Sequence, residues 1–277
     1  MGFFDFLKKK KAPQATEVKT SSVNTIDTIS QSKKKASIDS EINRIKKKYA
    51  LLESKIATKS PICPECKTKL ERMPSKKRSC PHCGSVMIVR TSPITQKKLL
   101  LTEQSFEQIE KSWKEYKYSL RWMRSLSKSY NISSPVFSKK RTELSKKFGV
   151  EPNQHDVILD IFNDLAVKML NIIPIDYGNL SSLYFSQAMF LYENNKPFFE
   201  TLQESNKMCL TRFQQHGVRK VQLMSGSESC KECLNNDGET MTINQALKEM
   251  PIPRKDCTYE LEKGKPGWCR CTYVYVG

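Results

Sequence analysis

Cysteine is the residue type whose spacing in this sequence best indicates chemistry, and four cysteines lie in one short stretch. "CPECKTKLERMPSKKRSCPHC" contains two C-x-x-C pairs, Cys63 with Cys66 and Cys80 with Cys83. Each pair can present two thiolates from one tight turn, and Zn²⁺ binds four such ligands at tetrahedral corners, about 2.3 Å from each sulfur. We therefore predict a structural zinc site with these four ligands. Four cysteines leave no open coordination position, so catalytic zinc is not expected.

A second cluster of cysteines occupies the last part of the chain: Cys230, Cys233, Cys257, Cys269 and Cys271. Residues i and i+2 of an extended strand point to the same side, so the last two could both face one metal, or one could bind while the other packs. The cluster predicts a second structural zinc, held by the first three cysteines and either of the last two. A redox C-x-x-C is the alternative, but no βαβ unit surrounds this pair.

Both clusters resemble known modules. The stretch 61–94 resembles the zinc ribbons of nucleic-acid-binding and protein-assembly factors. The C-terminal stretch resembles the C-terminal module of phage Mu F-type head morphogenesis (minor capsid) proteins, through these residues: Gly217, Val218, Cys230, Cys233, Gly238, Cys269, Arg270 and Cys271. That family usually has His-Pro before its C-R-C, whereas this chain has Pro266, Gly267 and Trp268, and it adds Cys257. The resemblance implies a metal-stabilised module and a phage or mobile-element origin.

Positive charge is concentrated in the first half of the chain. Residues 1–150 contain 34 Lys and Arg against 13 Asp and Glu, whereas residues 151–277 contain 13 against 16. Such blocks are typical of segments that bind nucleic acid or another anionic surface. The candidate nucleic-acid contacts lie in the expected ribbon and in the helix after it: Lys76, Lys77, Arg78, Arg90, Lys114, Lys117, Arg121 and Arg124. Tyr118 and Trp122 lie among them and could stack on bases; a solvated helix face is the alternative.

Hydrophobic periodicity predicts a mostly helical framework. Apolar residues at helical spacing indicate an amphipathic helix at 37–60 and a long basic helix within 95–134. The seam of the first helix has coiled-coil spacing, which is compatible with self-association through 37–57 or with docking onto the rest of the chain. Four more helices are expected in 135–217. We place the start of the third near Asn179 and put Pro197 in the first turn of the fourth.

The predicted fold class is mostly α: a helical body with two small zinc-bound β modules, the N-terminal zinc ribbon and the C-terminal Cys-rich module. The expected domains are a disordered basic N-terminal segment (1–36), an amphipathic helix (37–60), the zinc ribbon (61–94), a basic long helix (95–134), a helical domain (135–217) and a C-terminal Cys-rich zinc module (218–277). Zn²⁺ at two sites is the predicted cofactor.

No sequence motif indicates an enzyme, since a phosphate-binding glycine loop, G-x-S-x-G and H-E-x-x-H are all absent. We expect a non-enzymatic binding or assembly protein whose basic half engages nucleic acid or an acidic protein partner. The alternative is a metal-dependent nuclease or other hydrolase that uses Asp156, Asp160 and Asp164 on one helix face. We expect no transmembrane segment and no secretory signal. Ten cysteines then favour metal binding over disulfides, and a cytoplasmic location.

Overall fold

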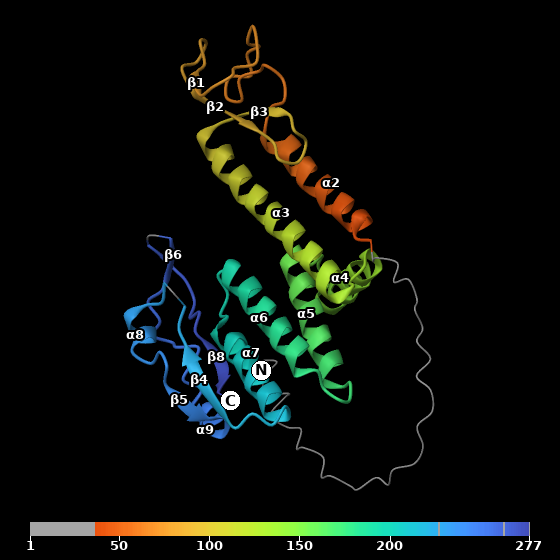
Figure 1. Ribbon diagram of the computed structural model, residues 1–277. Helices are drawn as coiled ribbons and strands as arrows, with labels where there is room; N and C mark the ends of the chain where they lie inside the picture. Colours follow the sequence, from red (N-terminus) through yellow and green to blue (C-terminus); the bar gives the residue numbers. More distant parts are fainter. Residues whose placement is uncertain (1–36, 227, 263, 277) are drawn as a thin grey trace. The chain divides into compact units, whose positions relative to one another are not determined.

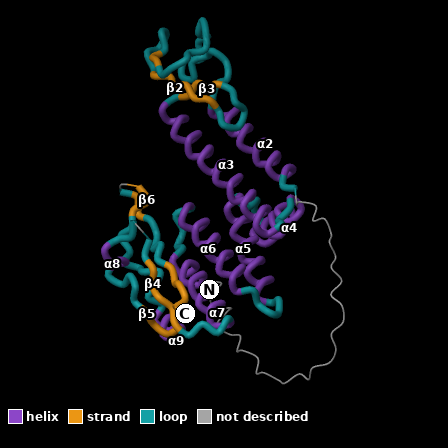
Figure 2. The backbone as a smooth tube through the Cα atoms, viewed as in Figure 1, coloured by secondary structure: helices purple, strands orange, loops and turns teal. Residues whose placement is uncertain are grey.

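The computed structural model describes residues 37–226, 228–262 and 264–276 (Figure 1). Residues 36–277 form one compact unit. The segment 1–36, predicted to be basic and disordered, lies outside the described residues. The described part is mostly helical with small sheets (Figure 2), so the predicted fold class is confirmed at that level. The domain boundaries given above stay predictions.

Eight helices run through the described residues: α2 (Asp39–Ile56), α3 (Glu103–Tyr130), α4 (Ser134–Phe148), α5 (Gln154–Leu170), α6 (Tyr177–Glu193), α7 (Phe199–Gln215), α8 (Lys231–Leu234) and α9 (Ile243–Glu249). Their ends follow local chemistry. The Thr102 side chain caps α3 by accepting a hydrogen bond from the Ser105 amide, and Gly149 ends α4 in the left-handed conformation that favours glycine. Among the described residues, no helix is both long enough and apolar enough to span a membrane.

The strands form three small antiparallel sheets. The first has the order β1 (Arg78–Ser79), β2 (Val86–Thr91), β3 (Lys98–Leu101). The second has the order β5 (Thr240–Thr242), β4 (Lys220–Met224), β8 (Thr272–Val276), and the third pairs β6 (Glu260–Glu262) with β7 (Lys265–Pro266). Each three-stranded sheet shares a hydrophobic cluster with one set of cysteines, so the sheets position the two candidate metal centres.

Strand β3 joins the first cysteine cluster to the helices. Leu99 and Leu101 are fully buried in the large core that the helices form, whereas Leu100 is fully buried beside Cys63 and Cys80. This division follows from the two-residue period of a strand, which sends neighbouring side chains to opposite faces. One face of the sheet therefore carries the cysteine turns, and the other packs on the helical core, with α3 in contact with β2 and β3.

A buried carboxylate fixes the same junction. Glu53 of α2 is 1% exposed and accepts hydrogen bonds from Trp113 Nε1 of α3 at 2.8 Å and from Ser92 Oγ at 2.5 Å. Ser92 Oγ in turn accepts the backbone amides of Ile94 and Thr95. Because a buried charge is costly unless it is hydrogen-bonded, these contacts hold α2, α3 and the β2–β3 turn in one arrangement.

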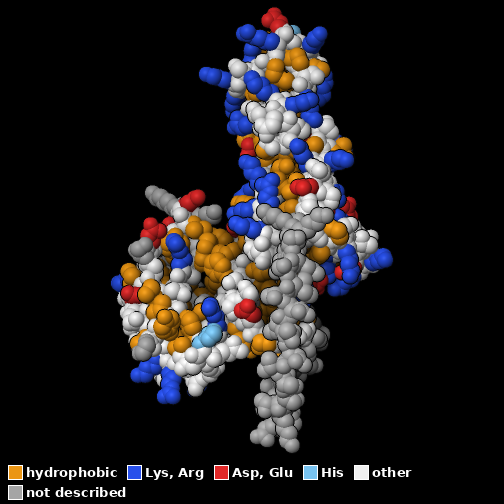
Figure 3. Space-filling model, turned by 45° about the vertical axis from the view of Figure 1, so that its right-hand side comes forward, with side chains coloured by type: hydrophobic (Ala, Val, Ile, Leu, Met, Phe, Trp, Pro, Cys, Tyr) orange, Lys and Arg blue, Asp and Glu red, His pale blue; other side chains and the backbone are white. Residues whose placement is uncertain are grey.

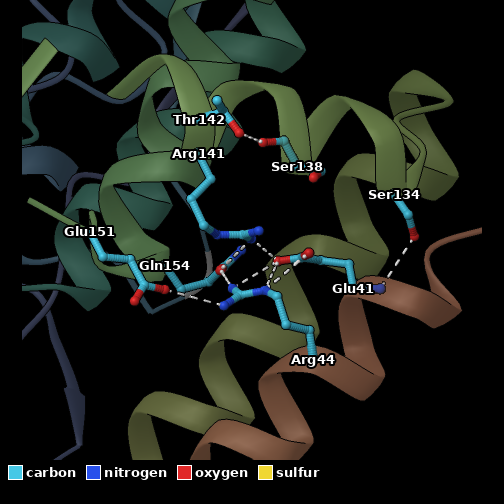
Figure 4. A network of polar contacts seen from close by, with 8 residues as sticks. All are labelled: Glu41, Arg44, Ser134, Ser138, Arg141, Thr142, Glu151 and Gln154. Carbon is cyan, nitrogen blue, oxygen red and sulfur yellow. Dashed lines mark hydrogen bonds and ion pairs between the residues drawn. The ribbon is translucent and has the colours of Figure 1, made fainter. Parts of the chain in front are cut away.

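A second polar network ties the start of α2 to the helical body (Figure 4). Glu41 is 3% exposed, and its carboxylate pairs with Arg44 of α2 and with Arg141 of α4. Arg44 Nη2 also donates to Gln154 Oε1 of α5 at 2.9 Å. Helix α2 therefore shares one set of compensated charges with the consecutive helices α4 and α5, which are distant from it in the sequence.

The predicted seam of α2 packs on its own chain. Ile38 and Ile45 are buried in the large core, and Ile42, Tyr49 and Ile56 pack against that core. Docking onto the rest of the chain therefore accounts for the seam. Self-association through 37–57 stays a prediction, and it would need surface other than these buried residues.

Two helix starts differ from the sequence prediction. Helix α6 begins before Asn179, because the Asp176 carboxylate accepts the Asn179 amide at 3.0 Å and acts as the cap. Helix α7 begins at Phe199, so Pro197 precedes the helix instead of lying in its first turn.

Candidate metal centres

The first four thiols lie in two turns of the same construction. In the first turn the Cys63 amide donates to the Thr68 carbonyl at 2.9 Å, and in the second the Cys80 amide donates to the Ser85 carbonyl at 2.8 Å. The fifth residue of each turn has a positive φ, which at Gly84 is 74°. The two halves of this centre are therefore local repeats that each present a pair of sulfurs.

These turns bring all four sulfurs within 4.8 Å of one another. Cys63 Sγ lies 3.8 Å from Cys83 Sγ, and Cys66 Sγ lies 3.8 Å from Cys80 Sγ, each across the two turns. Four thiolates around one ion with bonds of about 2.3 Å stand about 3.8 Å apart. The observed spacing is that of a tetrahedral thiolate site, so this group could hold a metal ion.

Hydrogen bonding favours the thiolate form at the two exposed sulfurs. Thr68 Oγ1 lies 3.4 Å from Cys66 Sγ and lowers the pKa of that thiol. Ser85 Oγ lies 3.4 Å from Cys83 Sγ, and it lowers the Cys83 pKa to about 6. Burial instead raises the pKa of Cys63 to about 11. Thr68 and Ser85 are part of this site, although the C-x-x-C motif does not include them. Each lies two positions after a C-x-x-C pair, and this spacing could have identified them from the sequence.

Three segments supply the five C-terminal thiols. Cys230 precedes α8 and Cys233 lies within it, so one short turn carries both. Cys257 lies in the loop before β6, and Cys269 and Cys271 lie in the segment before β8. The prediction that the last two cysteines share an extended strand is wrong. Strand β8 begins at Thr272, so both cysteines precede it, and their sulfurs lie within 4.8 Å of each other.

The five sulfurs form two overlapping groups that share Cys233. One group adds Cys230 and Cys257, and the other adds Cys269 and Cys271. The separations from Cys257 Sγ are 3.7 Å to Cys230 Sγ and 3.9 Å to Cys233 Sγ, and Cys233 Sγ lies 3.8 Å from Cys269 Sγ. These individual separations are close to the spacing of about 3.8 Å in tetrahedral thiolate coordination. Each group of three could hold a metal ion, and no four of these five sulfurs all lie within 4.8 Å of one another.

The proton is unevenly shared between the last two thiols. The hydrogen bond with Cys271 lowers the pKa of Cys269 to about 5, and the same interaction raises the pKa of Cys271. Burial raises the pKa of Cys233 and raises that of Cys257 to about 11. This hydrogen bond therefore favours the thiolate form at Cys269.

The segment before the last two cysteines is docked onto the helical body. The Trp268 ring contacts Tyr192 of α6 with centroids 5.0 Å apart, and Tyr192 Oη donates to the Pro266 carbonyl at 2.5 Å. The Gly267 amide donates to the Tyr259 carbonyl at 2.7 Å. A Cβ at Gly267 would lie 2.5 Å from Tyr259 Cδ1, so no other residue fits there without movement. Pro266, Gly267 and Trp268 thus have a structural role in this chain, because their contacts fix the segment that leads to Cys269 and Cys271.

All eight basic residues predicted to contact nucleic acid are exposed, and Figure 3 shows Lys and Arg side chains over the described ribbon and α3. Three of them, Lys77, Arg90 and Arg121, each pair with one carboxylate. The prediction that Trp122 stacks on bases is wrong. Its side chain is 7% exposed and belongs to the large core, where Nε1 donates to Glu193 at 2.7 Å.

Two of the three aspartates of the hydrolase alternative, Asp160 and Asp164, form ion pairs with a lysine. Lys140 Nζ lies 3.1 Å from Asp160 and 2.5 Å from Asp164, and so compensates both charges. Within the described ranges, the groups of three or more close ligand atoms are all made of cysteines. This geometry does not favour a catalytic cation on the α5 face.

Comparisons with protein-family models, curated proteins and solved structures find no match to this chain. The resemblance to phage head morphogenesis proteins therefore stays a prediction, and the function is inferred from the geometry of the sites themselves.

Proposed function

We propose that this chain is a non-enzymatic, zinc-stabilised protein that binds nucleic acid. In this proposal the binding surface consists of the ribbon and α3, defined as residues 61–134. The remaining helices and the C-terminal module form the body that supports this surface.

The observation that carries the proposal is positive charge without carboxylate partners. Residues 61–134 contain 15 Lys and Arg against 6 Asp and Glu, whereas residues 135–277 contain 18 against 17. All fifteen are exposed. Among the described residues three of the fifteen form ion pairs, which leaves twelve with no carboxylate within 4.0 Å. Uncompensated surface charge of this kind attracts polyanions and gains free energy from the counterions they release.

Zinc is the metal that best fits both centres, because soft thiolates at tetrahedral spacing are typical of structural zinc. The proposed ligands of the ribbon ion are Cys63, Cys66, Cys80 and Cys83. Those of the second ion are Cys230, Cys233, Cys257 and Cys269, which contribute the three separations close to 3.8 Å described above. Cys271 is then the fifth, unligated thiol. When bound, each ion supplies folding free energy to its module.

Fluorescence anisotropy with labelled DNA and RNA, in single strands and duplexes, tests the binding function on the full-length, metal-loaded protein. We expect log K to fall linearly with log salt, by about 0.7–0.9 per phosphate contact. The variant Lys114→Gln, Lys117→Gln, Arg124→Gln should reduce that slope by about 2 to 3. Arg121 is left intact because its pairing with Glu193 also anchors α3 to α6.

The matched control removes the same charge from exposed positions in the charge-balanced region, as Lys168→Gln, Lys196→Gln, Lys248→Gln. We expect the control to bind as the unmodified chain does. Failure of the unmodified protein to bind any oligonucleotide at low salt would overturn the proposal and leave an acidic protein as the partner to test.

A further inference from the structure

A hollow of about 460 Å³ opens on the ribbon beside the second cysteine turn. Its polar lining consists of three cations, one carboxylate and one imidazole: Lys69, Arg72, Arg78, Glu71 and His82. We call it the ribbon hollow. None of the four ribbon cysteines lines it. Of the eight basic residues predicted from the sequence to contact nucleic acid, Arg78 alone belongs to its lining.

The backbone of the metal centre presents these side chains. Lys69 lies in a β-bridge with Ile62, next to the first cysteine turn. Arg78 pairs with Met87 across β1 and β2, and His82 lies inside the second cysteine turn. The cations therefore come from two segments, residues 69–72 and β1, and the second cysteine turn adds the imidazole, so the fold of the ribbon brings together the groups that line the hollow.

Glu71 offsets part of the charge in the ribbon hollow, and the three cations against this one carboxylate leave an excess of positive charge. The ion pairs of the ribbon involve Lys77 and Arg90, and none in the described part involves Lys69, Arg72 or Arg78. Like charges that face one concavity repel each other unless an anion lies between them. Guanidinium groups bind phosphate through paired hydrogen bonds and are the preferred side chains for that purpose.

The size of the ribbon hollow limits the ligand. Small-molecule sites have volumes of roughly 300–1,000 Å³, so about 460 Å³ has room for a phosphate together with an attached sugar. We propose that the ribbon hollow binds a phosphate group of a nucleic acid, with Arg72 and Arg78 as its principal ligands and Lys69 as the third charge. This inference rests on the proposed function and narrows it to one phosphate-binding position on the ribbon.

Inorganic phosphate is the first probe. Amide chemical shifts of the full-length, metal-loaded protein are followed during titration with phosphate, and with chloride at equal ionic strength. We expect saturable shifts confined to residues 69–82 with phosphate only. The double variant Arg72→Gln, Arg78→Gln should abolish these shifts. The control Lys97→Gln, Lys98→Gln removes the same charge from the β2–β3 hairpin and should leave the shifts intact. Equal shifts with chloride, or shifts that survive in the Arg72/Arg78 variant, overturn the proposal.

Oligonucleotides are the second probe, and they distinguish the source of the phosphate. If a 5′-phosphorylated strand binds more tightly than the same strand with a 5′-hydroxyl, the ribbon hollow binds a terminal phosphate. If the two strands bind equally, it binds a backbone phosphate. In both cases the Arg72/Arg78 variant should bind at least about tenfold more weakly than the Lys97/Lys98 control, because it loses charge-assisted hydrogen bonds to the phosphate.

The two probes separate this inference from the proposed function. If the unmodified protein binds oligonucleotides and the Arg72/Arg78 variant binds them as the control does, the ribbon hollow is not the phosphate site and the proposed function stands. If no oligonucleotide binds although inorganic phosphate shifts residues 69–82, the proposed function fails and the assignment to nucleic acid fails with it.

Discussion

The two cysteine centres share individual sulfur separations of 3.7–3.9 Å but are built in opposite ways. In the ribbon, two equivalent turns each supply two sulfurs, and each turn carries its own hydroxyl, from Thr68 or Ser85. In the C-terminal module, five sulfurs come from three unlike segments and form two groups that share Cys233. The first centre therefore has no spare thiol, whereas the second has one more than a tetrahedral ion needs.

The difference extends to the hydrophobic support of each centre. Besides its cysteines, the buried cluster of the ribbon contains only Leu70, Met87 and Leu100 among the described residues. The C-terminal cluster is larger and includes Leu210 of α7, Leu223 of β4 and Tyr273 of β8. Because a small module buries too little apolar surface to fold unaided, the ribbon turns should depend on their metal more than the C-terminal module does.

Loss of one ligand should produce the largest difference between the centres. Cys63→Ser should lower the metal content by one ion per chain and expose the ribbon amides to hydrogen exchange, because no other thiol can take its place. Cys271→Ser should leave the metal content unchanged, since the remaining four C-terminal cysteines complete the second set. Elemental analysis and hydrogen exchange measure both effects. Loss of one ion in Cys271→Ser would contradict the proposed ligand set.

A matched pair of leucines sharpens the comparison. Leu100 and Leu223 are both buried, one beside each centre, and Leu→Ala should cost about 2–5 kcal/mol of unfolding free energy in each case. We expect Leu100→Ala to weaken metal retention by the ribbon against a competing chelator more than Leu223→Ala weakens retention by the second centre. The opposite order would show that the ribbon does not rely on its metal more strongly.

Two glycines give a smaller effect. A methyl group at Gly267 meets Tyr259 Cδ1 at 2.5 Å and the Tyr259 carbonyl oxygen at 3.0 Å, whereas one at Gly84 meets nothing within 4 Å. Gly267→Ala should lower the free energy of unfolding by about 1–3 kcal/mol through overpacking. Gly84→Ala should lower it by about 1–2 kcal/mol, because residue 84 has a left-handed backbone conformation. Thermal unfolding compares them. A harmless Gly267→Ala would disprove the close approach of Gly267 to Tyr259.

The smallest perturbation is chemical labelling of the native protein. In a Cys209→Ser background, which removes the one cysteine outside both clusters, Cys271 should be the first thiol alkylated while Cys257 stays protected by metal. Mass mapping of the labelled peptides identifies which cysteines have been alkylated. Rapid labelling of Cys257 with Cys271 protected would instead place both cysteines of the C-R-C on the ion.

The sequence predicts those features of the molecule that depend only on residues close together in the chain. The spacing of Cys63 to Cys83 identifies one compact group, and the Thr-x-x-Gln pattern of Thr242 and Gln245, typical of a capping box, opens α9. Features set by distant contacts do not follow from pattern. Trp122 lies in a run of basic residues, yet its ring packs against Phe162 and Phe190 of two other helices.

The last two cysteines illustrate the same limit. The run that follows Cys269 alternates like a strand from the beginning, but pairing with β4 starts at Thr272, opposite Met224. Where a strand begins is decided by its neighbour, and the neighbour is not visible in the local pattern. The ribbon hollow is missed for a related reason, because its cations come from segments that only the folded turns bring together.

The sulfur-to-zinc ratio of the purified protein tests the central claim most directly. The chain contains 10 Cys and 10 Met, so its own sulfur serves as the internal standard for elemental analysis after dialysis against a weak chelator. Two bound ions predict ten sulfurs for each zinc. A ratio of twenty or more, or a different metal in stoichiometric amount, would contradict the account of two structural zinc centres.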